Sequence, residues 1–170
     1  MTGVFSHLVR LDEIAVRPRR IELEADAEAR AGIAKRLGVP SVERLAGTVS
    51  LRRLSDGVAL QGALEAALTR ICVASLDSMD EVIADSFDIR FGQAETPDEA
   101  TLDLDLDAPE PLPAEGLDLG EILIQQLALA MAAYPRKDGA PSLAEAYGRA
   151  APASPFAGLG EAFTAKRNKE

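Results

Sequence analysis

Two stretches decide the fold of this chain: residues 71–92, ICVASLDSMDEVIADSFDIRFG, and residues 116–137, GLDLGEILIQQLALAMAAYPRK. The first is typical of a strand, a turn and a second strand, because apolar residues flank a cluster of Asp and Ser. The strand over residues 71–76 is expected to carry Cys72 as a buried, inert thiol. In the second strand the apolar positions change from even to odd numbers, which predicts a bulge near Asp85.

The second stretch is predicted to form the main helix of the domain, about 16 residues and roughly 24 Å long. Asp118 is expected to cap its N-terminus, with Glu121 completing a capping box, and Pro135 is expected to end it. Such a helix can lie across a sheet and cover its apolar face. The apolar residues that share one helical face are Leu119, Ile122, Leu123, Leu127, Ala130, Met131 and Tyr134.

Upstream of these stretches, residues 42–54 and 58–71 predict a pair of antiparallel strands. An Asp-Gly turn signal at residues 56–57 joins them, with the Gly expected at positive φ. Residues 63–69, ALEAALT, favour a helix by propensity. The period-two pattern of the second strand runs through them unbroken, so a strand is the preferred interpretation.

The remaining elements complete an α+β fold. Residues 26–37 predict a short helix, because an Asp can cap its start and Gly38 can follow its end. Residues 19–24 predict an edge strand. We expect a bent, barrel-like antiparallel sheet covered by the main helix, with the short helix at its edge. The prediction is one domain over residues 1–137 and a weakly structured tail with at most short helices over residues 138–170.

The amino-acid composition fits a globular domain and limits the function classes. Of the 170 residues, 47% are hydrophobic, 4% are aromatic and none is Trp, which argues against aromatic base-stacking platforms. The single cysteine allows no internal disulfide, and no Cys/His cluster predicts a metal site. The start lacks the apolar core of a signal peptide, and the apolar run over residues 127–133 is too short to span a membrane. The cytoplasm is therefore expected.

Acidic residues are concentrated in the middle third of the chain. The net charge is −10, yet residues 73–121 alone hold 15 acidic residues and one basic residue, Arg90. Within this segment residues 101–106, TLDLDL, predict a short strand with Leu inward and Asp outward. These acidic residues either form a solvated loop that keeps the protein soluble or attract a basic protein partner. The candidate partner-binding residues are Asp98, Glu99, Asp103, Asp105, Asp107 and, beyond the main helix, Arg136.

No motif in the chain indicates catalytic chemistry. GxGxxG, P-loop, HExxH, GxSxG and CxxC sequences do not occur. A nucleophilic Cys72 would need a His base, and the single His is His7. The sequence therefore predicts a protein that is not an enzyme, with no catalytic residue, no metal, no cofactor and no small-molecule substrate.

The order of these features resembles the YceD family, the large ribosomal RNA subunit accumulation proteins. A strand, a Cys, a turn and a second strand precede an acidic spacer, and a D-L-G-E helix is followed by Pro-Arg. The resemblance covers about residues 5–160, and the segments FSHLVRLDEI and SPFAGL are similar to the alphaproteobacterial branch. The residues that carry it are Cys72, Leu76, Asp77, Phe87, Phe91, Asp118, Leu119, Gly120, Glu121, Gln126, Leu127, Pro135 and Arg136.

The resemblance implies a cytoplasmic, non-catalytic factor needed for accumulation of large-subunit ribosomal RNA. Its partner would be a ribosomal protein or a precursor of that RNA. Many relatives carry a second Cys three residues after the first, where this chain has Ser75, so no metal or redox role is carried over. Phe87 and Phe91 are expected in the core, which leaves Gln126 and Arg136 as the better candidates for contacts.

Other functions are compatible with the same sequence. One is an acidic adaptor or holding protein for a basic partner outside ribosome assembly. Another is an uncharacterised hydrolase that uses the acidic cluster. A third is direct RNA binding by the basic ends, Arg17, Arg19, Arg20, Lys166, Arg167 and Lys169.

Overall fold

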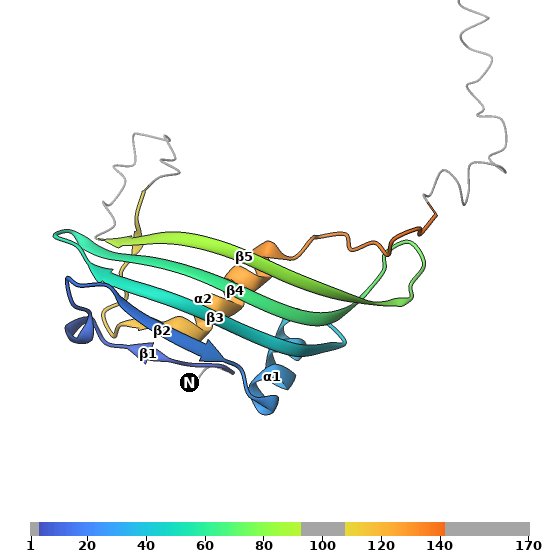
Figure 1. Cartoon of the computed structure of the whole chain (residues 1–170), viewed down its shortest axis with the longest axis horizontal. Helices are drawn as coiled ribbons and strands as arrows, with labels where there is room; N and C mark the ends of the chain where they lie inside the picture. The colour runs from blue at the N-terminus through green and yellow to red at the C-terminus, as the bar shows by residue number, and fades with distance from the viewer. Residues whose placement is uncertain (1–3, 93–107, 142–170) are drawn as a thin grey trace, which may run out of the picture.

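The protein has an α+β fold built on one five-stranded sheet (Figure 1). The structure is a computed structural model and describes residues 4–92 and 108–141. The sheet has the strand order β2-β3-β4-β5-β6, and a small second sheet pairs β1 with β7. The strands are β1 (Leu8–Val9), β2 (Arg19–Glu24), β3 (Ser41–Arg53), β4 (Gly57–Ile71), β5 (Ser78–Gly92), β6 (Glu110–Pro111) and β7 (Leu117–Asp118). The helices are a short 3-10 turn, η1 (Leu11–Glu13), with α1 (Ala27–Leu37) and α2 (Leu119–Ala130).

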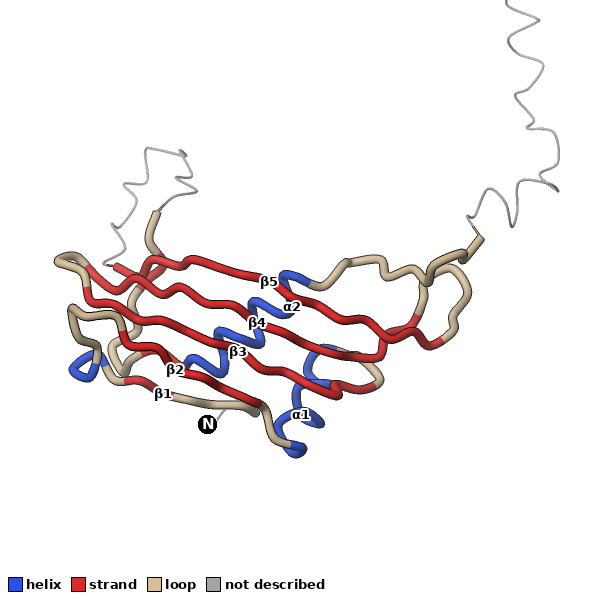
Figure 2. Tube along the Cα trace, viewed as in Figure 1, coloured by secondary structure: helices blue, strands red, loops and turns tan. Residues whose placement is uncertain are grey.

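The long strands β3, β4 and β5 form the antiparallel centre of the sheet (Figure 2). The predicted pairing of residues 42–54 with residues 58–71 is confirmed, and residues 63–69 are strand rather than helix. Pairing with a neighbour on each side overrides the helix propensity of this short stretch. Every second side chain of β4 faces the core, as the pattern predicts: Val58, Leu60, Leu64, Ala66 and Leu68 are buried.

The sheet departs from the prediction in two respects. It is open rather than barrel-like, because β2 and β6 remain separate edges. β5 also has no bulge near Asp85, since its 15 residues pair with β4 without a register shift. The apolar positions change from even to odd numbers for a different reason. The apolar residues Val82 and Ala84 lie on the exposed face of β5, whereas Ile83 and Phe91 face the core.

α2 lies diagonally across one face of the sheet and closes the core (Figure 2). Gly47 of β3 makes room for it, because a Cβ at this position would lie 2.6 Å from Cδ2 of Leu123. Each buried Leu or Ile side chain contributes about 1.5–3 kcal/mol, so this face is a major source of stability. The buried large side chains of α2 are Leu119, Ile122, Leu123, Ile124 and Leu127.

α2 begins where predicted but ends early. The helix stops at Ala130, and Tyr134, which was expected on the apolar stripe, is exposed. Pro135 disfavours helical backbone in the residue before it. The chain after α2 instead bonds to the end of β4, where the Ala132 carbonyl accepts a hydrogen bond from Nη2 of Arg70 at 2.7 Å. The predicted helix end at Pro135 is therefore wrong.

α1 lies at one end of the sheet, and its predicted boundaries are confirmed (Figure 1). The carboxylate of Asp26 accepts the N–H of Ala29 at 2.8 Å and so caps the N-terminus. Gly38 follows the helix with φ 67°, a left-handed conformation that glycine adopts without a Cβ clash.

The turn between β3 and β4 uses its glycine differently from the prediction. Gly57 has no positive φ, so the expected left-handed turn residue is absent at this position. The carbonyl of Phe91 instead occupies the space that a Cβ of residue 57 would need. Close approach of two backbones, rather than turn geometry, therefore selects glycine here.

Some predictions fall outside the described residues. These are the strand over residues 101–106, the acidic candidates Asp98, Glu99, Asp103, Asp105 and Asp107, and the character of the tail beyond residue 141. The domain boundary at residue 137 also stays a prediction. None of the helices in the described part of the chain is long and apolar enough to cross a membrane.

Candidate interaction surface

The two stretches that carry the family-like residues meet just after β4. We call residues 72–77 the Cys72 turn. Within it the Cys72 N–H donates to the Asp77 carbonyl at 2.9 Å. From the chain after α2, the Pro135 carbonyl accepts the N–H of Val73 at 2.9 Å. β4 ends before this turn, so the expectation of a strand over residues 71–76 is wrong.

The Cys72 side chain is buried in this turn, not in the middle of a strand. Its Sγ accepts the backbone N–H of Lys137 at 3.3 Å. This bond, followed by donation from the hydroxyl and the backbone N–H of Ser75, lowers the pKa of the Cys72 thiol to about 6. Ser75 therefore stabilises the thiolate.

Arg70 is the one buried charged residue among the described residues, and sequence reasoning did not single it out. Its Nη1 donates to Oε2 of Glu81 on β5 at 2.9 Å, and its Nη2 donates to the Ala132 carbonyl at 2.7 Å. The guanidinium thus ties β4, β5 and the chain after α2 together. The sequence pattern could have identified it, because Arg70 occupies the next even-numbered, inward-facing position of β4 after Leu68.

Apolar side chains are exposed around the Cys72 turn. Leu76 is 76% exposed and Tyr134 is 79% exposed, and Ile71 and Val73 are exposed as well. Leu76 also has φ 62°, a left-handed conformation that costs a non-glycine residue about 1–2 kcal/mol. Exposed apolar side chains and strained backbone both mark binding sites. We call these four side chains, Ile71, Val73, Leu76 and Tyr134, the Cys72 surface.

Asp118 fastens the start of α2 to the N-terminal segment. Its carboxylate accepts backbone N–H groups in the first turn of α2, which confirms the predicted N-cap. The same carboxylate accepts the hydroxyl of Ser6 at 2.6 Å and the N–H of His7 at 2.8 Å. These bonds give Asp118 a structural role.

Glu121 does not complete the predicted capping box. Its carboxylate binds both terminal nitrogens of the Arg36 guanidinium on α1. The hydrogen bond from Arg36 is the main reason that the pKa of Glu121 is lowered, and a bond from Gln125 acts in the same direction. A guanidinium forms a stronger charge-assisted bond than the N-cap amide does, and it is within reach.

Four further motif residues are buried in the core or packed against it. Phe91 is buried, and Phe87 packs so closely on β4 that a Cβ on Gly62 would overlap its ring. Leu119 and Pro135 are buried. Their packing explains why the fold needs these residues without assigning them any contact with a partner.

The two motif residues expected to make contacts are both partly accessible. Gln126 on α2 is half-buried, and Arg136 is exposed. Nη2 of Arg136 donates to the Pro141 carbonyl at 2.9 Å, so one end of this guanidinium is already used within the chain. Arg136 directly follows the buried Pro135 and therefore lies beside the Cys72 surface.

Over residues 4–92 and 108–141, no group of three or more His, Cys, Asp or Glu side chains is placed to hold a metal ion. Membership of the YceD family stays a prediction carried by the residues placed above. No protein-family model, curated protein or solved structure matches this chain.

Proposed function

We propose that this protein is a non-enzymatic factor in large ribosomal subunit assembly, needed for accumulation of large-subunit ribosomal RNA. The observation that carries the proposal is the meeting of the two family-like stretches. Cys72 bonds to Lys137 and Val73 bonds to Pro135, at a place where apolar side chains are exposed. This function implies a cytoplasmic protein that acts by binding a ribosomal protein or an RNA precursor.

A protein partner fits this surface better than RNA does. The Cys72 surface is apolar, as the centres of protein interfaces are. A phosphate backbone needs cations, whereas residues 73–121 hold 15 acidic residues against one basic residue. Such a field attracts basic proteins and speeds their association. We therefore favour a role in holding a basic ribosomal protein before it joins the large subunit.

The direct test is affinity purification of the tagged full-length protein, followed by mass spectrometry and RNA sequencing. Wild-type protein should recover large-subunit ribosomal proteins or precursor particles. The double variant Leu76→Ser, Tyr134→Ser should recover roughly tenfold less, because exposed apolar anchors carry much of an interface's binding energy. Val16→Ser is the matched control, since Val16 is another exposed apolar residue far from the Cys72 turn in sequence. Wild-type protein that recovers no ribosomal component would remove the proposal.

A second candidate function is a holding protein for a basic partner outside ribosome assembly. The charge of residues 73–121 favours it equally. The same purification separates the two, because recovery of a basic, non-ribosomal protein would select this alternative. Direct RNA binding through Arg17, Arg19 and Arg20 would show affinity that falls steeply with salt and is lost when these residues are neutralised.

A further inference from the structure

Among the described residues, the outer edge of β5 pairs with another strand at two of its positions alone, Phe91 and Gly92. β5 has 15 residues, and the strand that pairs with these two is β6. Within the described ranges, no other strand lies beyond β5 (Figure 2). About half of the backbone N–H and C=O groups of residues 78–90 therefore point away from the sheet without a strand partner.

The second half of this edge, residues 84–90, lies away from the chain that follows α2 (Figure 1). In Figure 1 the chain after α2 runs beside the first half of β5 toward the Cys72 turn. That chain bonds to Arg70 and Val73 rather than to β5. Long edge strands pair readily with other chains unless a loop, a proline or charge protects them. On β5 the exposed charged side chains favour a partner strand of opposite charge.

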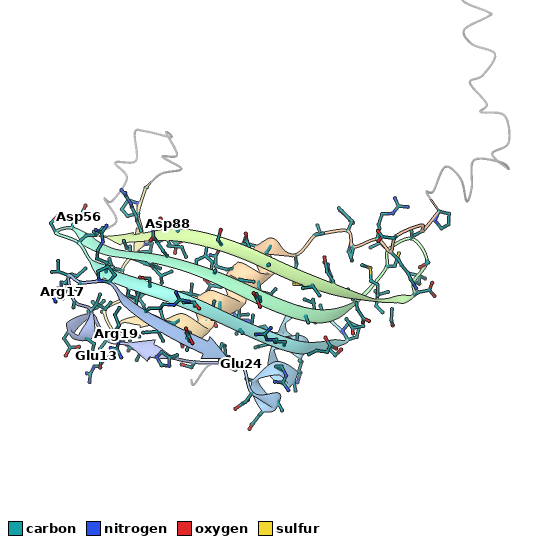
Figure 3. All side chains as sticks on the ribbon, in the orientation of Figure 1. Glu13, Arg17, Arg19, Glu24, Asp56 and Asp88 are labelled. Carbon is teal, nitrogen blue, oxygen red and sulfur yellow. The ribbon has the colours of Figure 1, made fainter. Side chains whose placement is uncertain are left out.

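Two exposed carboxylates mark the open half of the edge. Asp85 and Asp88 form no salt bridge with any described residue, and Asp88 accepts a hydrogen bond from the neutral amide of Gln61 at 2.8 Å. Figure 3 shows Asp88 at the β5 edge of the sheet, whereas Arg17 and Arg19 lie near the β2 edge. β5 exposes three acidic residues, Asp80, Asp85 and Asp88, against one basic residue, Arg90. The strand is therefore net negative, and a positively charged strand is complementary to it.

We propose that residues 84–90 of β5 bind a basic, extended peptide of a partner protein as an added strand of the sheet. Main-chain hydrogen bonds to the open edge would supply affinity, and side chains opposite β5 would supply specificity. Asp85 and Asp88 are three positions apart, so the residues opposite them in an added strand are also three apart. The peptide therefore carries Lys or Arg at both ends of a four-residue segment, with an apolar residue opposite the half-buried Phe87.

The test uses the full-length, isotope-labelled protein titrated with synthetic peptides and read by amide hydrogen exchange. The probe peptides contain Lys-Ser-Val-Arg and its reverse, Arg-Val-Ser-Lys, for parallel and antiparallel addition. Matched peptides carry the basic residues two positions apart, carry Glu in their place, or are N-methylated at alternate residues. A saturating probe should slow exchange of edge amides within residues 84–90 at least roughly tenfold. The N-methylated peptide should not bind, because it cannot donate the main-chain hydrogen bonds.

Charge variants of the protein give an independent readout. The double variant Asp85→Asn, Asp88→Asn should weaken probe binding roughly tenfold, because it removes two exposed charge interactions and the steering that they provide. Glu13→Gln with Glu28→Gln removes the same net charge from exposed residues on η1 and α1, and should change affinity by less than about twofold. Unchanged exchange in residues 84–90, equal binding of the N-methylated peptide, or equal weakening by the control variant would each overturn the proposal.

The β5 proposal specifies how the partner in the proposed function would bind. It rests on that function in one respect, namely that the basic peptide would belong to a ribosomal protein. If ribosomal components co-purify while the probe peptides fail, the β5 proposal fails alone. If the peptides bind as expected while no ribosomal component is recovered, the ribosomal function fails alone. Binding of large-subunit RNA without any peptide binding would also reject the β5 proposal.

Discussion

The backbone N–H of Lys137 donates to Sγ of Cys72 at 3.3 Å, which joins two segments 65 residues apart in the sequence. A thiolate accepts this bond more strongly than a thiol does, and the pKa of Cys72 falls to about 6 as a result. The bond therefore links the protonation state of one side chain to the contact between the Cys72 turn and the chain after α2. Stability at this place must depend on pH.

We predict that Cys72→Ser destabilises the protein by an amount that grows with pH. The thiol titrates near its ordinary pKa of about 8.5 in the unfolded chain, and at about 6 in the folded protein. A depressed folded-state pKa contributes nothing below the folded value and its full amount above the unfolded value. The difference in unfolding free energy between wild type and variant should therefore rise between about pH 6 and pH 8.5, then level off. Urea denaturation at about pH 5, 7 and 9 measures it.

Ser75→Ala is the companion variant for this prediction. It removes the hydroxyl that donates to the thiolate, so the pKa of Cys72 should rise toward its ordinary value. Thiolate absorbance in the far ultraviolet follows the titration directly. A difference between wild type and Cys72→Ser that stays constant across this pH range would contradict the thiolate assignment.

Arg70→Met is predicted to be strongly destabilising. The substitution leaves the Glu81 carboxylate and the Ala132 carbonyl without their partner in a partly buried place. Breaking one half of a buried ion pair costs about 3 kcal/mol, whereas an exposed pair contributes below about 1 kcal/mol. Arg44→Met, which breaks an exposed pair with Glu65, is the control. Chemical denaturation should rank the two variants in that order, and the reverse order would refute the structural role of Arg70.

Removing Asp118 should cost more than removing an ordinary helix cap. Asp26→Ala removes the cap of α1 and should cost about 1 kcal/mol. Asp118→Ala removes the cap of α2 and also the bonds to Ser6 and His7, so about 2–3 kcal/mol is expected. Denaturation midpoints compare the two variants, and Asp118→Asn should cost less than Asp118→Ala because its amide oxygen can still accept. Equal effects of the two alanine variants would show that the N-terminal bonds contribute little.

Sequence patterns predicted the elements whose interactions are local. The caps at Asp26 and Asp118 bond to amides two or three residues away, so the signal and its partner lie in the same short window. The period-two pattern of β4 was legible because one face of the strand is buried along its whole length. These signals were sufficient for an α+β fold with a covering helix.

Distant partners explain what the sequence did not predict. The role of Arg70 depends on Ala132, which is 62 positions away, and the acidity of Cys72 depends on Lys137. Glu121 has the correct spacing for a capping box, yet Arg36 from another helix binds it instead. A periodicity or a cap motif contains no information about which distant donor the fold brings within reach.

Substitutions of Leu76 should raise the stability of the protein while they weaken binding of the partner. Leu76 has φ 62° and is 76% exposed, so it is strained and buries little apolar surface. Leu76→Gly relieves the left-handed strain but gains flexibility in the unfolded chain, and a net stabilisation of about 0.5–1 kcal/mol is expected. Leu76→Asn keeps a side chain that tolerates this conformation and controls for flexibility. Thermal denaturation should show both variants at least as stable as wild type, while affinity purification should recover less of the partner with both. If either variant binds the partner normally, Leu76 is not a contact residue; if both are clearly less stable, its side chain is part of the fold's packing.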